Sequence, residues 1–268
     1  MMKLIADSSA NLTMLEGVTY QSVPMTIRAG ERDFVDDETL DTHELLDYLA
    51  AHNGKSGTAC PSLDGWLKAF EGADEIFVIT ITSSLSGTCA SAMAARDVYL
   101  QSHPEVKIHI FDTLSTGPEM QLLAEKLAEL HAKGLPFDVI CEKAQEYLAT
   151  THLFFSFKSL HNLAQNGRVS KIAAGAIGIL GIQILATASL EGTIQPVEKC
   201  RGEKRRARRW YRSFWKLATT AARCASTTPK IQRRLGRSPL RCAGTFPKQT
   251  LRSVPAVVFA ATMPSAAA

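Results

Sequence analysis

Residues 75–100 read EIFVITITSSLSGTCASAMAARDVYL and contain the three features that decide the fold. The run from Glu75 to Ile81 is apolar and β-branched, which is typical of a strand covered on both faces. A hydroxyl-rich loop, TSSLSGT (82–88), comes next, and residues 89–100 predict a helix. A buried strand that leads through a short loop into a helix is the repeating unit of a parallel α/β sheet.

The same pattern continues on both sides of this unit. KLIAD (3–7) and VKIHIFD (106–112) predict buried strands, and VTYQSVPMTI (18–27) alternates well enough for a further strand. Ser62 is placed to cap a helix that opens at Pro61. Apolar spacing predicts the helices 37–52, 61–70, 121–134 and 136–151. Strands that alternate with helices indicate an α/β domain over residues 1–157.

Three polar loops follow the carboxyl ends of predicted strands: 7–13, 82–88 and 112–118. In an open parallel sheet these loops share one edge, which is where ligands bind. Their hydroxyls, with the segment GTACPS (57–62), suit an anionic head group held by hydrogen bonds and helix dipoles. Alternatively, Ser, Thr and Asp in these loops only cap helices and form turns. The residues alone leave both interpretations open.

Cysteine spacing and the start of the chain bear on the class of protein. The six Cys residues show no C-x-x-C spacing, which argues against a zinc site, and we expect no metal. Lys3 is followed at once by a short strand that ends at Asp7, so we expect no signal peptide. Unpaired thiols suit a reducing cytosol, which predicts a cytoplasmic protein.

Residues 172–190 carry no charge and pass a crude test for a membrane span. Three glycines and the polar residues Gln183, Thr187 and Ser189 weaken that interpretation. We expect a buried loop followed by a strand rather than a transmembrane helix.

Six motifs in this order resemble the DegV family of bacterial fatty-acid-binding proteins, which includes the FakB subunits of fatty acid kinase. The resemblance covers roughly residues 2–204 and implies a two-domain α/β fold. In that fold the parallel-sheet domain (1–157) precedes a second lipid-binding α/β domain, which begins at 158–204 and is incomplete here. The motifs are ADSSANLT (6–13), GTACPS (57–62), ITSSLSGTCASA (81–92), FDTLSTG (111–117), LHNLAQNGRVSK (160–171) and GTIQPVEKCRGEK (192–204).

The resemblance also implies a set of ligand-binding residues. Thr58 resembles the carboxylate-binding threonine of the family's T-S-Q-P-S motif, and Ser86, Gly87 and Thr88 resemble the S-G-T turn that holds the same group. Arg168 resembles an arginine near the phosphorylated head group. The chain departs from the family pattern at three positions: Ala59 and Cys60 replace Ser and Gln, and Asn166 stands where Gly is commoner.

The function implied by the resemblance is that of a carrier. The protein would bind a long-chain fatty acid and present the carboxylate to a separate ATP-dependent fatty acid kinase, without catalysis or a cofactor of its own. The residues also give little support to a hydrolase. No G-x-S-x-G elbow is present, the histidines show no pairing with a nucleophile, and Asp7 lacks the D-x-D pattern of phosphotransfer aspartates.

The charge is divided sharply along the chain. Residues 1–203 carry 15 Lys or Arg and 26 Asp or Glu, whereas residues 204–268 carry the other 15 Lys or Arg and no acid. One explanation is a nucleic-acid-binding arm, because Trp210, Tyr211, Phe214 and Trp215 could stack on bases. The others are a disordered tail and translation in a shifted reading frame.

The shifted frame is the explanation that we favour for residues 205–268. Permitted codons for FWKLATTAARCAST (214–227), read from an offset of two bases, give a helix end, a glycine turn and a strand. The same offset in 248–267 permits a segment like the closing part of DegV proteins, with its histidine. We therefore expect 205–268 to pack poorly, to leave the second sheet without its completing strand, and to bind no specific nucleic acid.

Overall fold

The computed structural model describes residues 1–268 except 53, 158–159, 170–181, 202–241, 244–255 and 263–268. Its first sheet is parallel, with the strand order β2-β1-β6-β7. The strands are β1 (Met2–Asp7), β2 (Thr19–Val23), β6 (Glu75–Thr80) and β7 (Lys107–Asp112). This confirms the parallel α/β class that residues 75–100 predict.

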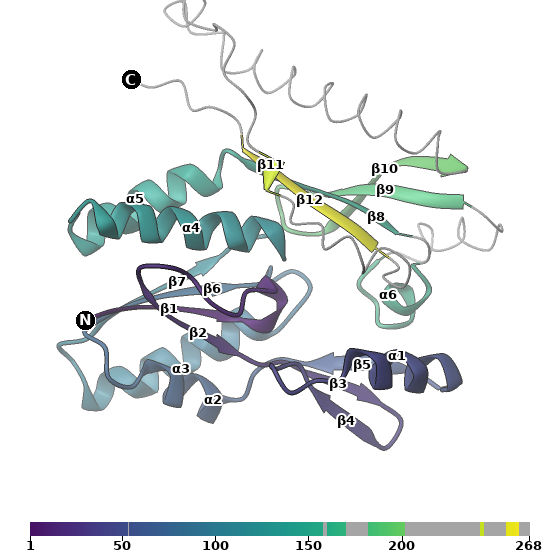
Figure 1. Ribbon diagram of the computed structural model, residues 1–268, viewed down its shortest axis with the longest axis horizontal. Coiled ribbons are helices and arrows are strands. Elements are labelled where there is room, and N and C mark those ends of the chain that lie inside the picture. The colour runs from purple at the N-terminus through teal and green to yellow at the C-terminus, as the bar shows by residue number, and fades with distance from the viewer. Residues whose placement is uncertain (53, 158–159, 170–181, 202–241, 244–255, 263–268) are drawn as a thin grey trace, which may run out of the picture.

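Helices cover both faces of the parallel sheet. Figure 1 shows α4 (Pro118–Ala132) and α5 (Phe137–Leu148) on one face, and α2 (Leu63–Phe70) and α3 (Thr88–Ser102) on the other. Each face has its own core, with Phe77 stacked on Phe137 in one and Trp66 fully buried in the other. The continuous apolar runs of the strands follow from this burial on both faces.

The predicted strand 18–27 is wrong in its extent, because the chain divides at Pro24 into two strands of different sheets. Proline has no N–H to donate to a ladder, so a break there costs the sheet no hydrogen bond. Beyond it, β3 (Thr26–Ala29) is central in a small antiparallel sheet with β4 (Arg32–Val35) and β5 (Ser56–Ala59).

The helix predicted over 37–52 is shorter than expected. It is α1 (Thr42–Ala51), and Asp41 Oδ1 accepts from the N–H groups of His43 and Glu44 at its start. An acidic side chain that satisfies two free N–H groups fixes a helix start, which explains the late beginning.

The second sheet is antiparallel and has the strand order β10-β9-β8-β12-β11. Its strands are β8 (Thr151–Phe157), β9 (Ile182–Ala188), β10 (Ile194–Arg201), β11 (Cys242–Ala243) and β12 (Ala256–Thr262), and the short helix α6 (His161–Gln165) follows β8. Strand β8 lies before the domain boundary predicted at 157 but belongs to the second sheet, and the boundary itself stays a prediction. Strand β9 confirms the strand expected in 172–190, while the loop expected before it falls on residues 170–181, outside the described part.

Strand β12 corrects the expectation that residues 205–268 add no strand to the second sheet. It pairs antiparallel with β8 from Ala256 opposite Phe157 to Thr262 opposite Thr151. Its sequence AVVFAAT contains two valines and a phenylalanine, residue types that suit a strand. The poor packing expected for the rest of 205–268 concerns residues outside the described part. The origin of this segment in a shifted reading frame stays a prediction.

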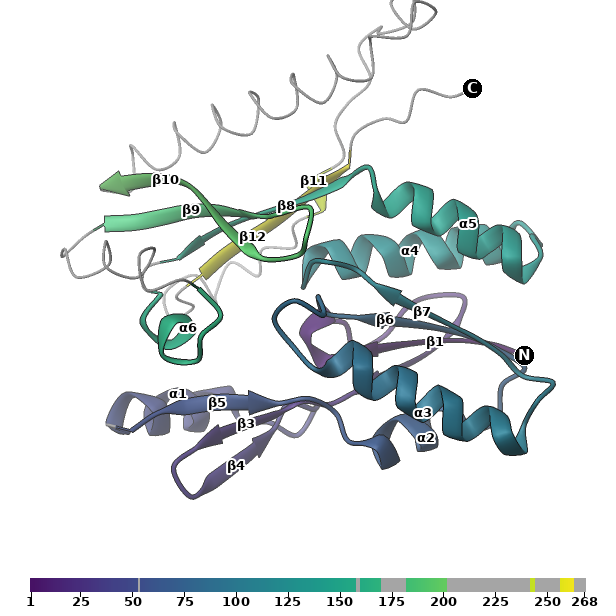
Figure 2. The same ribbon diagram turned by 180° about the vertical axis from the view of Figure 1, so that it is seen from behind.

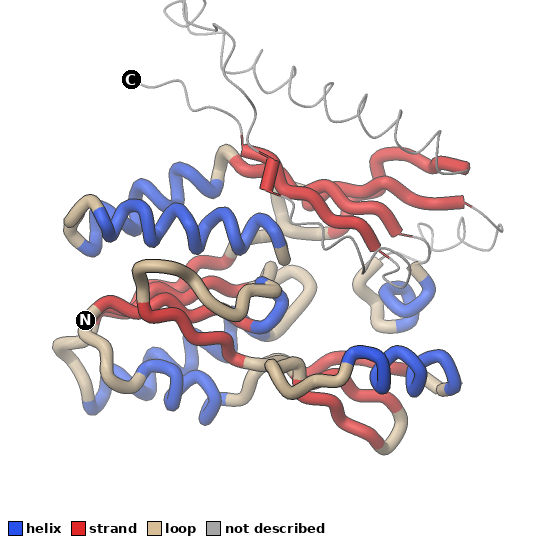
Figure 3. The backbone as a smooth tube through the Cα atoms, viewed as in Figure 1, coloured by secondary structure: helices blue, strands red, loops and turns tan. Residues whose placement is uncertain are grey.

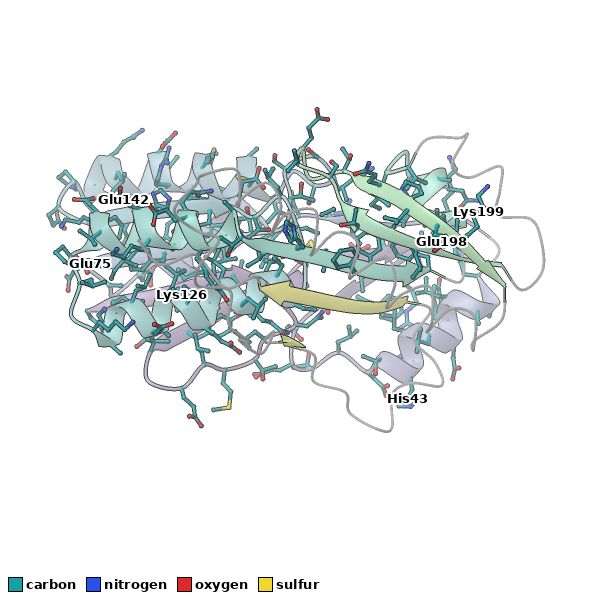
Figure 4. All side chains as sticks on the ribbon, turned by 90° about the horizontal axis from the view of Figure 1, so that it is seen from above. His43, Glu75, Lys126, Glu142, Glu198 and Lys199 are labelled. Atoms are coloured by element: carbon teal, nitrogen blue, oxygen red, sulfur yellow. The ribbon has the colours of Figure 1, made fainter. Side chains whose placement is uncertain are left out.

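The two large sheets are joined through α4. Leu122 of α4 packs with Leu153 and Phe155 of β8 in a separate apolar cluster. Figure 2 shows α6 between the second sheet and the layer formed by α1 and β5, and Figure 3 shows the two large sheets as separate red layers. In Figure 4, Glu75 lies near one end of the molecule and Lys199 of β10 near the other.

Candidate functional site

The loops after β1, β6 and β7 meet at one edge of the parallel sheet, as the sequence predicts. The N–H of Ile81 donates to Asp7 Oδ2 at 2.7 Å, and the N–H of Thr82 donates to the carbonyl of Ser115 at 2.9 Å. Carboxyl ends of parallel strands at one edge form the usual ligand-binding crevice of an α/β sheet.

Several hydroxyls of these loops are engaged within the fold. Ser8 Oγ donates to Asp36 Oδ2 at 2.7 Å, and Thr113 Oγ1 donates to the carbonyl of Thr80 at 2.8 Å. For the loops 7–13 and 112–118, the interpretation as caps and turns accounts for these side chains. In the loop 82–88 the hydroxyls of Thr82 and Ser84 are engaged as well, which leaves Ser86 and Thr88 as the candidates for contacting a ligand.

Asp7 is a buried structural carboxylate. Its Oδ1 accepts from the N–H and the hydroxyl of Ser9, and its Oδ2 accepts from the N–H of Ile81. Burial raises the pKa of Asp7, and these hydrogen bonds oppose that shift. Oδ1 therefore closes the turn of the first loop and Oδ2 links that loop to the end of β6, which leaves no support for Asp7 as a phosphotransfer group.

Ser86, Gly87 and Thr88 form the start of α3. The hydroxyls of Ser86 and Thr88 lie 2.8 Å apart, and Thr88 is fully buried. Gly87 is the N-cap of α3 and has no side chain to bond the first turn. The first N–H groups of a helix have no partner inside it, so this end of α3 suits an anion.

The segment that carries Thr58 lies beside this helix start. Thr58 is exposed in β5, opposite Ile27 of β3. A Cβ on Gly87 would lie 3.7 Å from Cys60 Sγ, and Ser91 Oγ of α3 donates to the carbonyl of Pro61 at 2.9 Å. The loop after β5 is thus packed on the first two turns of α3, as the predicted grouping of these motifs requires.

Arg168 reaches the same region from the segment after α6. Its Nε donates to the carbonyl of Leu85 at 3.0 Å, one residue before Ser86. Its Nη1 donates to the carbonyl of Asn166 at 2.6 Å, and the residue as a whole is exposed. A guanidinium has five N–H donors, so Arg168 retains others for an anion.

Three contacts near this site were not predicted from the sequence. Thr88 Oγ1 lies 3.9 Å from Met25 Sδ, Thr82 Oγ1 donates to the carbonyl of Gly192 at 3.0 Å, and Ser84 Oγ donates to the carbonyl of Glu191. The last two hold loop 82–88 against the β9–β10 turn. No local motif signals such contacts, because the partners are 63 to 110 residues apart.

One histidine departs from the expectation that none pairs with a nucleophile. His103 Nδ1 lies 3.0 Å from Ser102 Oγ, at the far end of α3 from Ser86. Both groups also lie within hydrogen-bonding distance of the carbonyl of Tyr99, which makes them part of the helix end. This pair therefore gives no support to a hydrolase.

Metal and membrane criteria give negative results within the described ranges. No group of three or more His, Cys, Asp or Glu residues there could hold a metal ion. Among the helices that the structure describes, none is long and apolar enough to cross a membrane.

Comparisons with known proteins identify relatives over most of the chain. The family model described as an uncharacterised protein of the DegV family matches residues 1–226. A DegV domain-containing protein of Streptococcus pneumoniae is 37% identical over 257 residues, which cover 94% of this chain and 92% of the relative.

Two solved structures with high similarity carry fatty acids. A DegV family protein from Eubacterium eligens, loaded with heptadecanoic acid, is 42% identical with a TM-score of 0.76, covering 90% of this chain and 82% of that one. The fatty acid kinase (Fak) B3 protein of Streptococcus pneumoniae, loaded with linoleic acid, is 40% identical with a TM-score of 0.78. That similarity covers 81% of this chain and 79% of the B3 protein.

Proposed function

The chain belongs to the DegV family, and on this premise we propose that it binds a long-chain fatty acid and presents the carboxylate to an ATP-dependent fatty acid kinase. In this proposal it is a cytoplasmic carrier without catalytic activity or a cofactor. The fatty acids in the two similar structures support the ligand class, and the name of the B3 protein supports the link to a kinase.

One observation supports the proposal: three separate segments that carry predicted donors pack around the start of α3. Thr58 comes from β5, Ser86 and Thr88 from the loop after β6, and Arg168 from the segment after α6. A buried carboxylate needs such donors, because burial without hydrogen bonds is costly. The hydroxyls and the end of α3 would hold the carboxylate, while the acyl chain gains about 0.8 kcal/mol for each buried CH₂.

We propose different roles for the hydroxyls and for Arg168. The hydroxyls and N–H groups lie at the start of a 15-residue helix, whose dipole favours negative charge. The Arg168 side chain is exposed, so its remaining donors are open to a second protein and to the phosphoryl group that it transfers. Arg168 would then contribute more to phosphorylation than to fatty-acid binding.

A coupled assay tests this proposal. Protein loaded with oleate is mixed with a fatty acid kinase and ATP, and acyl phosphate is measured. We expect product only when all three components are present, and Arg168→Gln should lower the rate more than it lowers oleate affinity. Arg96→Gln is the matched control, because Arg96 lies on the body of α3 and pairs with Asp97. Product without the kinase would contradict the carrier role.

A further inference from the structure

Asn166 lies at the end of α6, and its side chain contacts the strand that carries Thr58. Its amide nitrogen Nδ2 donates to the carbonyl of Ser56 in β5 at 2.8 Å and to the carbonyl of Asn162 in α6 at 2.8 Å. A side-chain amide has two N–H donors, so both bonds form together. Asn166 therefore fastens the end of α6 to β5.

Gly57, next to Thr58, fits closely against this amide. A Cβ at position 57 would lie 3.3 Å from Asn166 Oδ1, which is closer than an ordinary van der Waals contact. Strand β5 is at the edge of its three-stranded sheet, so one side of its backbone is open to a partner other than a strand. The close fit indicates that glycine at position 57 accommodates the side chain of Asn166.

The main chain of Asn166 holds Arg168 at the same time. The carbonyl of Asn166 accepts from Arg168 Nη1 at 2.6 Å, while Arg168 Nε bonds the carbonyl of Leu85. Between them, Gly167 has a φ of +71°, a left-handed conformation that glycine adopts readily and that turns the chain back. One residue thus contacts both the Thr58 strand and the Arg168 side chain.

We infer that Asn166 is a positioning residue of the fatty-acid head-group site, which fixes Thr58 and Arg168 relative to each other without touching the ligand. This inference rests on the proposed function. Hydrogen bonds weaken steeply with distance and angle, so the hydroxyls that hold the carboxylate and the Arg168 donors that face the phosphoryl group serve the same head group only when their separation is fixed.

The first test compares Asn166→Ala with Asn162→Ala, one helical turn earlier. The Asn162 side chain is exposed, and the main-chain carbonyl that accepts from Asn166 is kept in the variant. Each protein is titrated with oleate and with methyl oleate, which keeps the acyl chain but lacks the carboxylate. We expect Asn166→Ala to weaken oleate binding about tenfold, with little change for methyl oleate and for the control variant.

The ester separates positioning from a general loss of structure. Equal losses for oleate and methyl oleate in Asn166→Ala would overturn the inference, because they indicate a damaged fold rather than a displaced head-group site. Unchanged oleate affinity would overturn it as well. Failure of the unsubstituted protein to prefer oleate over the ester would instead contradict the proposed function.

A second variant checks the contact from the other side. Gly57→Ala places a Cβ against Asn166 Oδ1, and the crowding disappears when residue 166 is alanine. We expect Gly57→Ala to weaken oleate binding severalfold alone, and to add little in the Gly57→Ala, Asn166→Ala double variant. Additive losses in the double variant would show that the two residues act independently and would contradict the inference.

Discussion

Thr88 allows a test of the head-group site with a small change in packing. The side chain is fully buried at the start of α3, and its hydroxyl lies 2.8 Å from that of Ser86. Valine keeps the shape but removes the hydroxyl, so Thr88→Val should weaken fatty-acid binding by about tenfold and change the melting temperature little. Titration with a fluorescent fatty acid measures the affinity.

Ser102→Ala is the matched control for Thr88→Val, because it removes a hydroxyl from the opposite end of the same helix. Its affinity should equal that of the unsubstituted protein. Equal fatty-acid affinities of Thr88→Val and the unsubstituted protein would show that the Thr88 hydroxyl does not contribute to binding.

Glu119 is a buried carboxyl group, and its burial favours the neutral form. It accepts from Ser115 Oγ and lies against Thr151 Oγ1, which also donates to the carbonyl of Leu148 at 2.8 Å. A hydroxyl has one proton, so when Thr151 donates to Leu148 its oxygen can accept a hydrogen bond from protonated Glu119. Burial raises the pKa of Glu119 above the ordinary 4.5, and the hydrogen bonds oppose that shift.

This pKa shift predicts a pH-dependent difference between the protein and Glu119→Gln. The folded protein binds the proton of Glu119 more tightly, so the stabilising effect of Glu119 is complete below pH 4.5. It declines as the pH rises toward the raised pKa of the folded state. Glutamine stays neutral, so the stability of Glu119→Gln relative to the unsubstituted protein should rise over that interval. Urea unfolding at several pH values measures the difference.

We expect Asp7→Asn to behave differently from Glu119→Gln, although burial raises the pKa of Asp7 as well. The partners of Asp7 include the N–H groups of Ser9 and Ile81, which can only donate. An asparagine NH₂ facing either donor leaves it unsatisfied, which costs about 1–3 kcal/mol. Asp7→Asn should therefore be less stable than the unsubstituted protein at neutral pH. Loss of stability in Glu119→Gln at neutral pH would contradict the account of Glu119.

At the scale of elements, the β9–β10 turn supports loop 82–88 through Gly192. A Cβ at this position would lie 2.1 Å from Thr82 Oγ1, and φ is +76°. Gly192→Ala should lower the free energy of unfolding and weaken fatty-acid binding, because the turn must move away from the loop. Denaturant unfolding and ligand titration measure the two effects.

Gly72→Ala is the matched control for Gly192→Ala, because it introduces the same backbone strain without a steric clash. Gly72 also has a φ of +76°, but a Cβ there meets nothing within 4 Å. Its cost should be close to the strain alone, about 1 kcal/mol, with fatty-acid affinity unchanged. Gly192→Ala should cost about 1–3 kcal/mol more. Equal costs for the two variants would show that the turn does not press on Thr82.

Local patterns predicted the strands and helices around the parallel sheet because the residues that determine each element lie within that element or beside it. The apolar run of 75–81 and the Ser62 cap both act within a few residues. The Ser62 cap is confirmed by a bond to the N–H of Gly65 at 3.1 Å. Sequence could not assign strands to sheets: the chain changes sheet at Pro24, and β8 pairs with β9 and β12 across long separations.

The candidate site was predicted from motif order, whereas the contacts that build it were not. Thr58, Ser86, Gly87, Thr88 and Arg168 come from three segments, and the fold brings those segments together. Local spacing does not predict the contact of Asn166 with Ser56 or that of Thr82 with Gly192. Both contacts depend on how segments far apart in the sequence pack together. The roles of the five predicted residues remain proposals.

For the whole molecule, the separated charge gives a prediction about nucleic acid. Residues 204–268 carry 15 Lys or Arg and no acid, so some affinity for DNA at low salt is expected. Such binding releases counterions and should fall steeply as salt rises, without preference for sequence. Titrations of two unrelated duplexes at low and physiological salt check this. Tight, sequence-selective binding at physiological salt would favour the nucleic-acid alternative.

The most direct test of the central claim is native mass spectrometry of the protein purified from bacteria and then offered oleate. The account predicts one added mass of a long-chain fatty acid for each chain. The double variant Ser86→Ala, Thr88→Val should show less bound ligand under the same conditions. A protein that stays folded but shows no acyl ligand, even with excess oleate, would contradict the account.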